Sequence, residues 1–282
     1  MKIVVATAHG MCFGVSDALA AADRIEDPSE VTIYGELVHN EIVRERLLAR
    51  GFSQMGERDR EIPSTPAVLI TAHGVSGAER GRLAAAQLRV VDTTCPLVRH
   101  AHSMALQLDA EDRLVVVVGK GDHVEVRGIV GDLRRFVVIE SAEKVGNLGA
   151  ERIGVMSQTT TPDARFAEVV AAIRRENPNC DIKVVSTICR PTRERQQSVA
   201  ALLEEVQLLV VVGGERSRNS RELVETALRA GVAAHLVPSA AALDARWFEG
   251  VEIVGVTAGT STLPETFEEV LAALRQLSPA AC

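Results

Sequence analysis

Short runs of aliphatic residues alternate along the chain with longer segments in which apolar positions recur at helical spacing. The runs are brief and rich in valine, which predicts strands of parallel sheets covered on both faces. Their alternation with helical segments predicts an α/β fold. The predicted strands cover 2–6, 31–34, 68–71, 90–93, 114–118, 137–140, 152–156, 181–186, 208–212, 234–237 and 253–257. The predicted helices cover 16–25, 39–50, 78–87, 97–109, 166–176, 193–206, 221–230 and 265–277.

The length of the chain bears on the number of compact units. With 282 residues, it is long for one simple core, so two or three units are expected. Strand and helix content is similar in each third of the chain, and no long low-complexity linker separates the thirds. Three small α/β units around a shared centre therefore fit the pattern better than one long sheet.

Composition excludes several classes of protein. The net charge of -7 argues against a general nucleic-acid binder, because such proteins need a basic surface. No apolar run approaches the roughly 20 residues that span a bilayer, and residues 1–5 resemble a first strand rather than a signal sequence. We therefore expect a cytoplasmic protein with no nucleic-acid or membrane partner. Its five cysteines are too few and too scattered for a disulfide framework.

Three cysteines share one type of position. Cys12, Cys95 and Cys189 each follow a predicted strand and lie among polar loop residues, whereas Cys180 and Cys282 lie in turn-like or terminal sequence. No Cys-x-x-Cys pair and no fourth partner accompany the three. Our hypothesis is that they hold one 4Fe-4S cluster, in which one iron without a protein ligand acts as a Lewis acid on a substrate oxygen. The alternative is that they are small buried residues at strand ends.

A second group of polar residues suggests an anion site. His39, His73 and His123 follow predicted strands, and imidazoles suit a diphosphate in an acidic protein. Hydroxyl and amide groups near glycines and helix starts would form an anion cradle, although the same residues often act only as helix caps. The candidates of this kind are Ser217, Asn219 and Ser261. The chain lacks both a Walker loop and a dinucleotide-binding Gly-x-Gly-x-x-Gly after its first strand.

Glu125 follows His123 by two residues, in a segment predicted to be a loop. A carboxylic acid near the centre can relay protons to a leaving hydroxyl. The alternative is an ordinary solvated glutamate.

Taken together, these motifs resemble the 4-hydroxy-3-methylbut-2-enyl diphosphate reductase (LytB) family. They occur in family order, and the combination is highly specific. The matching stretches are Gly-Met-Cys-Phe-Gly-Val at 10–15, Glu-Leu-Val-His-Asn at 36–40, Ala-His-Gly-Val-Ser at 72–76, Asp-Thr-Thr-Cys-Pro-Leu-Val at 92–98, His-Val-Glu-Val at 123–126, Gln-Thr-Thr at 158–160, Thr-Ile-Cys at 187–189, Arg-Gln at 195–196, Asn-Ser at 219–220 and Thr-Ala-Gly-Thr-Ser at 257–261.

The resemblance implies a reductive dehydroxylase of the non-mevalonate isoprenoid pathway. Two electrons and protons enter, the allylic hydroxyl leaves as water, and isopentenyl and dimethylallyl diphosphates form. The fold would be a three-lobed α/β trefoil around a central iron-sulfur site, and ferredoxin or flavodoxin would supply the electrons. The implied lobes cover 13–95, 96–190 and 191–282, and residues 1–12 complete the last.

Roles carry over to this chain position by position. By the resemblance, the cysteines at 12, 95 and 189 would be the cluster ligands. Glu125 and Thr159 would position the hydroxyl and pass protons, with His123 contributing. The diphosphate would be held by His39, His73, His123, Ser217, Asn219 and Ser261.

The chain departs from the family pattern at a few positions. Arg218 stands where the family usually has a second serine, and its guanidinium is a candidate ligand of the diphosphate. Arg190, Pro191 and Val124 also differ from the common residues. Two alternatives therefore stay open: a redox-neutral iron-sulfur hydro-lyase acting on another anion, and a non-catalytic cluster-bearing sensor or binding protein.

Overall fold

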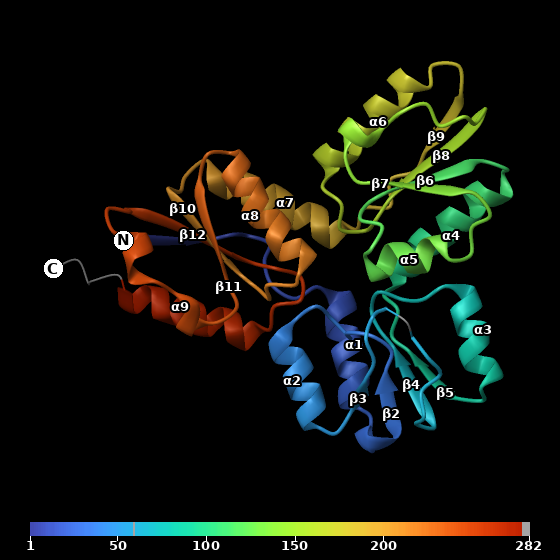
Figure 1. The fold of residues 1–282 in the computed structure, drawn as a ribbon. Helices are drawn as coiled ribbons and strands as arrows, with labels where there is room; N and C mark the ends of the chain where they lie inside the picture. The colour runs from blue at the N-terminus through green and yellow to red at the C-terminus, as the bar shows by residue number, and fades with distance from the viewer. Residues whose placement is uncertain (59, 278–282) are drawn as a thin grey trace. The chain divides into compact units, whose positions relative to one another are not determined.

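The computed structural model describes residues 1–58 and 60–277. Within these residues the strands form three four-stranded sheets, and all their pairings are parallel (Figure 1). This confirms the α/β class and the three parallel sheets predicted from the apolar runs. The chain divides into two compact units: unit 1 comprises 1–16, 38–45 and 190–282, and unit 2 comprises 17–37 and 46–189. The predicted lobe boundaries and the trefoil arrangement stay predictions.

Unit 1 contains the sheet that we call the third sheet. Its strand order is β1 (Lys2–Val5), β12 (Ile253–Ala258), β10 (Leu208–Val212), β11 (Ala233–Val237). Lys2 pairs with Ile253 and Val5 with Val256, so the first strand belongs to the same sheet as the last. The helices of this unit are α7 (Arg190–Leu203), α8 (Arg218–Arg229) and α9 (Pro264–Leu277).

Both faces of the third sheet are covered. Along β10, Val210 and Val212 pack in a cluster with apolar residues of α9. Leu209 and Val211 point to the other face and pack with residues of α7 and α8. Successive side chains of a strand alternate between faces, so a strand buried on both sides carries a continuous apolar run.

Unit 2 contains the other two sheets. The first sheet has the order β3 (Ser53–Gln54), β2 (Val31–Ile33), β4 (Ala67–Ile70), β5 (Arg89–Asp92). The second sheet has the order β7 (Phe136–Ile139), β6 (Leu114–Val118), β8 (Arg152–Ser157), β9 (Asp181–Val184). The helices of this unit are α3 (Gly77–Ala85), α4 (Pro96–Ala110), α5 (Val124–Val130) and α6 (Asp163–Glu176).

The remaining elements are short or shared. Helices α1 (Phe13–Asp23) and α2 (Glu41–Ala49) each contribute residues to both units. Four 3₁₀ turns are described, at Pro28–Glu30, Ala142–Lys144, Ala240–Ala242 and Ala245–Phe248.

The second sheet repeats the packing of the third. Val116 and Val118 of β6 face α6, while Val115 and Val117 pack with residues of α4 and α5. The carboxyl end of β6 is thereby fixed between helices on both faces. The segment that follows it carries two candidate site residues.

Helix α5 was missed in the sequence, where residues 119–125 were predicted to be a loop. Its seven residues include three valines, an isoleucine and a glycine, all weak helix formers. Burial stabilises it instead, because Val126 and Ile129 pack into the cluster with α4 and β6. Glu125 therefore lies in the first turn of a buried helix, not in a solvated loop.

Strand β3 was also missed, since two residues carry no periodic signal. Helices α7 and α8 each begin three residues before their predicted starts. In the described part of the chain no helix has both the length and the apolarity needed to cross a bilayer.

Tyr34 follows β2 and is fully buried in the cluster that joins the first sheet to α3. Its hydroxyl donates to Glu79 Oε1 and accepts a hydrogen bond from Arg82 Nη2 at 2.9 Å. Burial, reinforced by the bond to the Glu79 carboxylate, raises the pKa of Tyr34 to about 12. The neutral phenol is thus the form that the fold favours.

This pKa can be measured directly, because Tyr34 is the only tyrosine of the chain. We expect the phenolate absorbance of the native protein to rise near pH 12, and that of the urea-unfolded protein near pH 10. The stabilisation is present below about pH 10 and is lost as the pH rises toward 12, because only the unfolded chain ionises in that interval. Glu79→Gln should lower the native pKa, and a native titration at pH 10 would contradict this account.

Candidate functional site

The predicted site residues lie beyond the carboxyl ends of strands or at the helix starts that follow them. In a parallel sheet these ends lie along one edge, where helix N-termini also present unpaired N–H groups. In unit 2 they are Cys95 after β5, His73 after β4, His123 and Glu125 after β6, Thr159 after β8 and Cys189 after β9. In unit 1 they are Cys12 after β1, Ser217, Arg218 and Asn219 after β10, Ser261 after β12 and His39.

Glu125 and Thr159 form a doubly hydrogen-bonded pair in unit 2. The Thr159 backbone N–H donates to Glu125 Oε1 at 2.7 Å, and its hydroxyl donates to Oε2 at 2.9 Å. Glu125 is 2% exposed and Thr159 4%. A carboxylate this buried is held in place by its donors, so the pair has a fixed geometry. The threonine hydroxyl keeps its lone pairs for a further partner.

The same threonine contacts one of the candidate cluster ligands. The Cys189 backbone N–H donates to the Thr159 carbonyl at 2.9 Å. Glu125, Thr159 and Cys189 are thus joined by consecutive hydrogen bonds, which brings together residues from α5, the loop after β8 and the start of α7. The sequence predicted each of them separately but gave no sign of this connection.

His123 and His73 lie beside each other in unit 2. His123 caps α5, and its Nδ1 accepts the backbone N–H of Glu125 at 3.1 Å, which places the donor proton of a neutral ring on Nε2. The His73 and His123 rings meet edge to face, with centroids 5.7 Å apart. The neighbouring Gly74 has φ of 72°, and a Cβ there would lie 2.8 Å from Thr94 Cγ2. A larger residue would displace the loop that carries His73.

Cys95 occupies the N-cap position of α4 and Pro96 its first turn, so the helix begins one residue before its predicted start. The Cys95 backbone N–H donates to the Ala72 carbonyl at 3.0 Å, which ties this loop to the one that carries His73. The thiol makes no capping hydrogen bond to α4. Cys95 and Cys189 are both half-buried and are not joined in disulfides.

Cys12 lies in a loop of unit 1 that is held by a buried arginine. Its N–H donates to the Thr260 carbonyl at 3.1 Å, and the preceding Gly10 adopts φ of 71°. Arg195, which is 6% exposed, donates through Nε to the Gly10 carbonyl at 3.1 Å. The half-buried Cys12 thiol is thereby presented by a defined turn.

The loops after β10 and β12 meet around one serine. Ser217 caps α8, and Ser220 Oγ donates to its hydroxyl at 2.9 Å. A Cβ at Gly213 would lie 2.3 Å from Ser220 Oγ, and one at Gly259 would lie 2.0 Å away. Both glycines are needed because the loops close directly on this side chain. Asn219 is 7% exposed, and its Oδ1 is buried with no hydrogen-bond partner among the described residues.

The segment that carries His39 is bonded to the loop after β12. Asn40 Nδ2 donates to the Ser261 carbonyl at 2.8 Å, and Ser261 Oγ donates to the His39 carbonyl at 3.1 Å. Asn40 Oδ1 also accepts the Val43 N–H at 3.1 Å in the first turn of α2. The structure thus brings together two predicted anion ligands that are far apart in the sequence.

Arg218 engages acidic residues of its own helix. Its guanidinium pairs with Glu222 at 3.1 Å and Glu225 at 3.7 Å, and its side chain is only 18% exposed. Glu222 is also paired with Arg229, at 2.8 Å. The Arg218 guanidinium is therefore paired with two glutamates of α8. The sequence gave no indication of these ion pairs.

Two supporting residues were not among the predicted site residues. Glu41 Oε1 accepts the Arg216 N–H at 3.3 Å, and its Oε2 would lie 2.3 Å from a Cβ at Gly214, so it holds the loop before Ser217. Arg195 was noted only as part of a matching stretch. A glutamate at a helix start and an arginine within a helix give no local signal of such roles.

The chain is similar to known proteins along nearly its whole length. The family model described as LytB protein matches residues 3–275. A 4-hydroxy-3-methylbut-2-enyl diphosphate reductase of Neisseria meningitidis is 35% identical over 280 residues, covering 97% of this chain and 87% of that protein. One of Aquifex aeolicus with the same name is 34% identical, covering 98% and 97%.

Two solved structures of reductases with similar names resemble the fold of this chain. A structure described as (E)-4-hydroxy-3-methyl-but-2-enyl diphosphate reductase, the terminal enzyme of the non-mevalonate pathway, is 33% identical with a TM-score of 0.68, covering 98% of this chain and 99% of that one. The E-1-hydroxy-2-methyl-but-2-enyl-4-diphosphate reductase of Plasmodium falciparum has a TM-score of 0.89 at 23% identity, covering 99% and 89%, and so shows the shared fold.

Arg218 and Arg190 provide a matched test of the ion pairs. Each pairs with a glutamate four residues on, but the Arg218 side chain is 18% exposed and that of Arg190 is 84% exposed. Arg218→Ser should lower the free energy of unfolding by about 1–3 kcal/mol, because Glu222 stays buried with one fewer partner. Arg190→Ser should cause no measurable change in urea unfolding. Equal effects of the two substitutions would contradict the burial argument.

Proposed function

Because the chain belongs to the LytB family, we propose that it is a 4-hydroxy-3-methylbut-2-enyl diphosphate reductase. The enzyme removes the allylic hydroxyl of its diphosphate substrate. Two electrons and two protons enter, the C–O bond breaks, water leaves, and isopentenyl or dimethylallyl diphosphate forms. The family resemblance noted in the sequence is confirmed over nearly the whole chain.

The observation that carries the proposal within this structure is the chain of hydrogen bonds from Glu125 through Thr159 to Cys189. It connects a buried carboxylate and a hydroxyl to the backbone of a cysteine that forms no disulfide. A reductive dehydroxylation needs these groups together: a proton source, a group that orients the substrate hydroxyl, and a nearby source of electrons. A sensor would not need the first two.

The family implies a metal cofactor, and the donor set fits an iron-sulfur cluster. Cys12, Cys95 and Cys189 are half-buried, follow strands and form no disulfides. The Cys95 thiol is not used to cap its helix. Thiolate sulfur is the usual ligand of such clusters. We infer that these three cysteines hold one 4Fe-4S cluster, which would supply electrons and an iron able to bind the substrate oxygen.

Glu125 and Thr159 would orient the substrate hydroxyl and supply the proton with which it leaves as water. Because the Thr159 hydroxyl donates to Glu125, its lone pairs can accept the hydrogen of the substrate hydroxyl. When Glu125 is protonated, this hydrogen bond would reverse: the Glu125 O–H donates to the Thr159 hydroxyl, whose own hydrogen turns to the departing oxygen, so that one proton moves along the pair. His123, bonded through Nδ1 to the N–H of Glu125, would present its Nε2–H on the same side of α5.

The diphosphate would be bound by hydroxyl, amide and imidazole donors. Ser217, Asn219 and Ser261 are buried at loops and a helix start, and the unpartnered amide of Asn219 can turn its NH₂ toward an anion. The histidines at 39, 73 and 123 would complete the set. A direct contact of Arg218 with the diphosphate would compete with its pairs to Glu222 and Glu225. Ferredoxin or flavodoxin is the proposed electron donor.

Turnover tests the function. Anaerobically reconstituted protein is mixed with 4-hydroxy-3-methylbut-2-enyl diphosphate and reduced methyl viologen, and dye oxidation and products are followed. We expect dye oxidation that depends on substrate, with isopentenyl and dimethylallyl diphosphates as products. Substrate consumption without any reductant would instead indicate a hydro-lyase. Binding without reaction would indicate a sensor.

The cluster ligands can be tested by iron content. Cys12→Ser, Cys95→Ser and Cys189→Ser should each lose most of the iron and acid-labile sulfide after anaerobic reconstitution, because a hydroxyl is a poor ligand of a soft site. Cys180→Ser is the matched control, since the Cys180 thiol donates to the Ala150 carbonyl at 2.9 Å and should retain the wild-type iron content. Full iron content in any of the first three variants would remove that residue from the ligand set.

The proton relay can be tested at Glu125. Glu125→Gln preserves the volume and one acceptor for Thr159 but cannot deliver a carboxylic proton, so kcat should fall by about 10²–10⁴-fold. Iron content should stay at the wild-type level, which separates this loss from damage to the cluster. The control is Glu168→Gln on the exposed face of α6, which should leave kcat unchanged. An unaltered kcat in Glu125→Gln would overturn the relay.

A further inference from the structure

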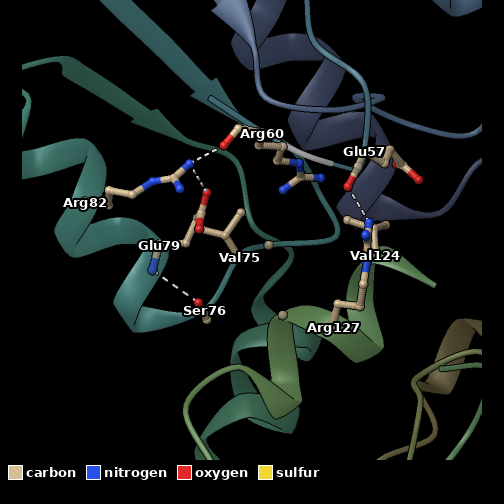
Figure 2. A pocket seen from close by; sticks show the side chains of 10 residues that line it. Glu57, Arg60, Val75, Ser76, Glu79, Arg82, Val124 and Arg127 are labelled. Carbon is tan, nitrogen blue, oxygen red and sulfur yellow. Dashed lines mark hydrogen bonds and ion pairs between the residues drawn. The ribbon is translucent and has the colours of Figure 1, made fainter. Parts of the chain in front are cut away.

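Unit 2 contains a cavity of about 300 Å³ that none of the predicted site residues lines. Its walls come from the segment between β3 and β4 and from the starts of α3 and α5 (Figure 2). Five charged side chains line it: Glu57, Arg60, Glu79, Arg82 and Arg127. Three guanidinium groups therefore converge with two carboxylates, which leaves an excess of positive charge in an otherwise acidic protein.

Hydrogen bonds fix this arrangement of side chains. Arg127 Nη2 donates to the Glu57 carbonyl, and Arg82 Nη2 donates to the Arg60 carbonyl, so two helices hold the same connecting segment from opposite sides (Figure 2). The start of α3 is held in turn, because Asp132 accepts the N–H groups of Gly77 and Ala78 at 2.5 and 2.9 Å. The guanidinium groups of Arg82 and Arg127 are thus preorganised by backbone contacts, although the Arg82 side chain is 47% exposed.

The charges of the cavity are unequally compensated. Glu79 is already bonded to Tyr34 and pairs with Arg82 at 3.0 Å. Arg60 lies over the Tyr34 ring at 4.8 Å, and its Nε and Nη2 are buried with no hydrogen-bond partner among the described residues. Arg127 Nε is in the same situation. Burial lowers the pKa of Arg60 and the nearby Arg127 lowers it further, whereas the carboxylates of Glu57 and Glu79 act in the opposite direction. Among the side chains that line the cavity, these two carboxylates face three guanidinium groups.

The donor geometry selects the type of anion. A guanidinium offers a planar fork of N–H donors and no acceptor, which matches the oxygens of phosphate in bidentate contacts. Three such groups approach the cavity from three elements, so an occupant needs acceptor oxygens in more than one plane. A planar carboxylate has two oxygens, whereas a phosphate group presents tetrahedral oxygens. The cavity is also large enough for a small ligand.

We propose that this cavity is a binding site for a small phosphate-type oxyanion, inorganic phosphate or diphosphate, held by Arg60, Arg82 and Arg127. The cavity shares no residue with the proposed substrate site and does not rest on the proposed function, although a carboxylate oxygen of Glu57 in its wall lies within 4.8 Å of a ring nitrogen of His73. It does border that site along the chain, because Gly74 and Val124 line the cavity and directly follow His73 and His123. A bound anion would therefore lie against the backbone that carries these two histidines.

Calorimetric titration of the reconstituted full-length protein tests the site, with inorganic phosphate and with diphosphate as separate ligands to identify which binds more tightly. Both titrations are run with 4-hydroxy-3-methylbut-2-enyl diphosphate present and reductant absent, so that the proposed substrate site is already occupied. For the tighter ligand, Arg60→Gln and Arg127→Gln should each weaken binding by at least about 10-fold, because each removes a charged hydrogen-bond donor. Arg58→Gln is the control: it removes the same charge from the same segment, but Arg58 is 73% exposed and pairs with Asp122 outside the cavity. It should bind like the wild type.

Circular dichroism of each variant accompanies the titration, and Arg127→Gln provides the test by itself if Arg60→Gln does not fold. Absence of phosphate and diphosphate binding in the wild type, or equal affinity in Arg127→Gln and the wild type, would overturn the proposal. An equal loss of anion affinity in Arg58→Gln would also overturn it, since the loss of any nearby positive charge would then explain the effect. Turnover is measured in parallel, so that a protein that binds the anion but lacks reductase activity would reject the proposed function alone.

Discussion

Parallel pairing of short, fully buried strands is the constraint on which the rest of the structure depends. Each strand of the three sheets must be followed by a connection that returns across a face, so all strands of a sheet end at the same edge. Every side chain of β10 is buried, as is every side chain of β6 after Leu114, which leaves no position within these strands for chemistry. Reactive and polar residues are therefore confined to the segments just beyond the strand ends.

Those segments are held by their neighbours rather than by their own conformational preferences. Ser220 fills the space that Cβ atoms at Gly213 and Gly259 would take, and Arg195 binds the carbonyl of Gly10 from α7. Glu125 is fixed by two donors of one threonine. Glu125 and Arg195 are thus bonded to partners distant in sequence, which fixes these loops without regular secondary structure. Such rigidity is what orientation of a substrate hydroxyl requires.

Membership of the LytB family accounts for the cysteine, histidine and hydroxyl positions, but this chain has features of its own. Arg218 is one, and its pairing with Glu222 and Glu225 shows how an arginine can be accommodated beside Asn219 without leaving its charge unbalanced. The arginine cavity of unit 2 differs from this arrangement. In this cavity three arginines face two carboxylates, and one of these, Glu79, is shared between Tyr34 and Arg82. The excess positive charge makes the cavity a candidate anion site, whereas Arg218 is neutralised in structural ion pairs.

The sequence by itself determined the α/β class, every strand except β3, and the family resemblance, because buried apolar runs and motifs such as Asp-Thr-Thr-Cys-Pro are visible locally. Only the tertiary structure decided that Val124–Val130 is a helix, since its valines and glycine disfavour one and burial against α4 supplies the stabilisation. It also decided that β1 pairs with β12, that Thr159 bonds to both Glu125 and Cys189, and that Arg218 turns to its own helix. A local pattern records that a side chain is buried or polar, but the partner that buries or pairs it comes from elsewhere in the chain and is chosen by packing.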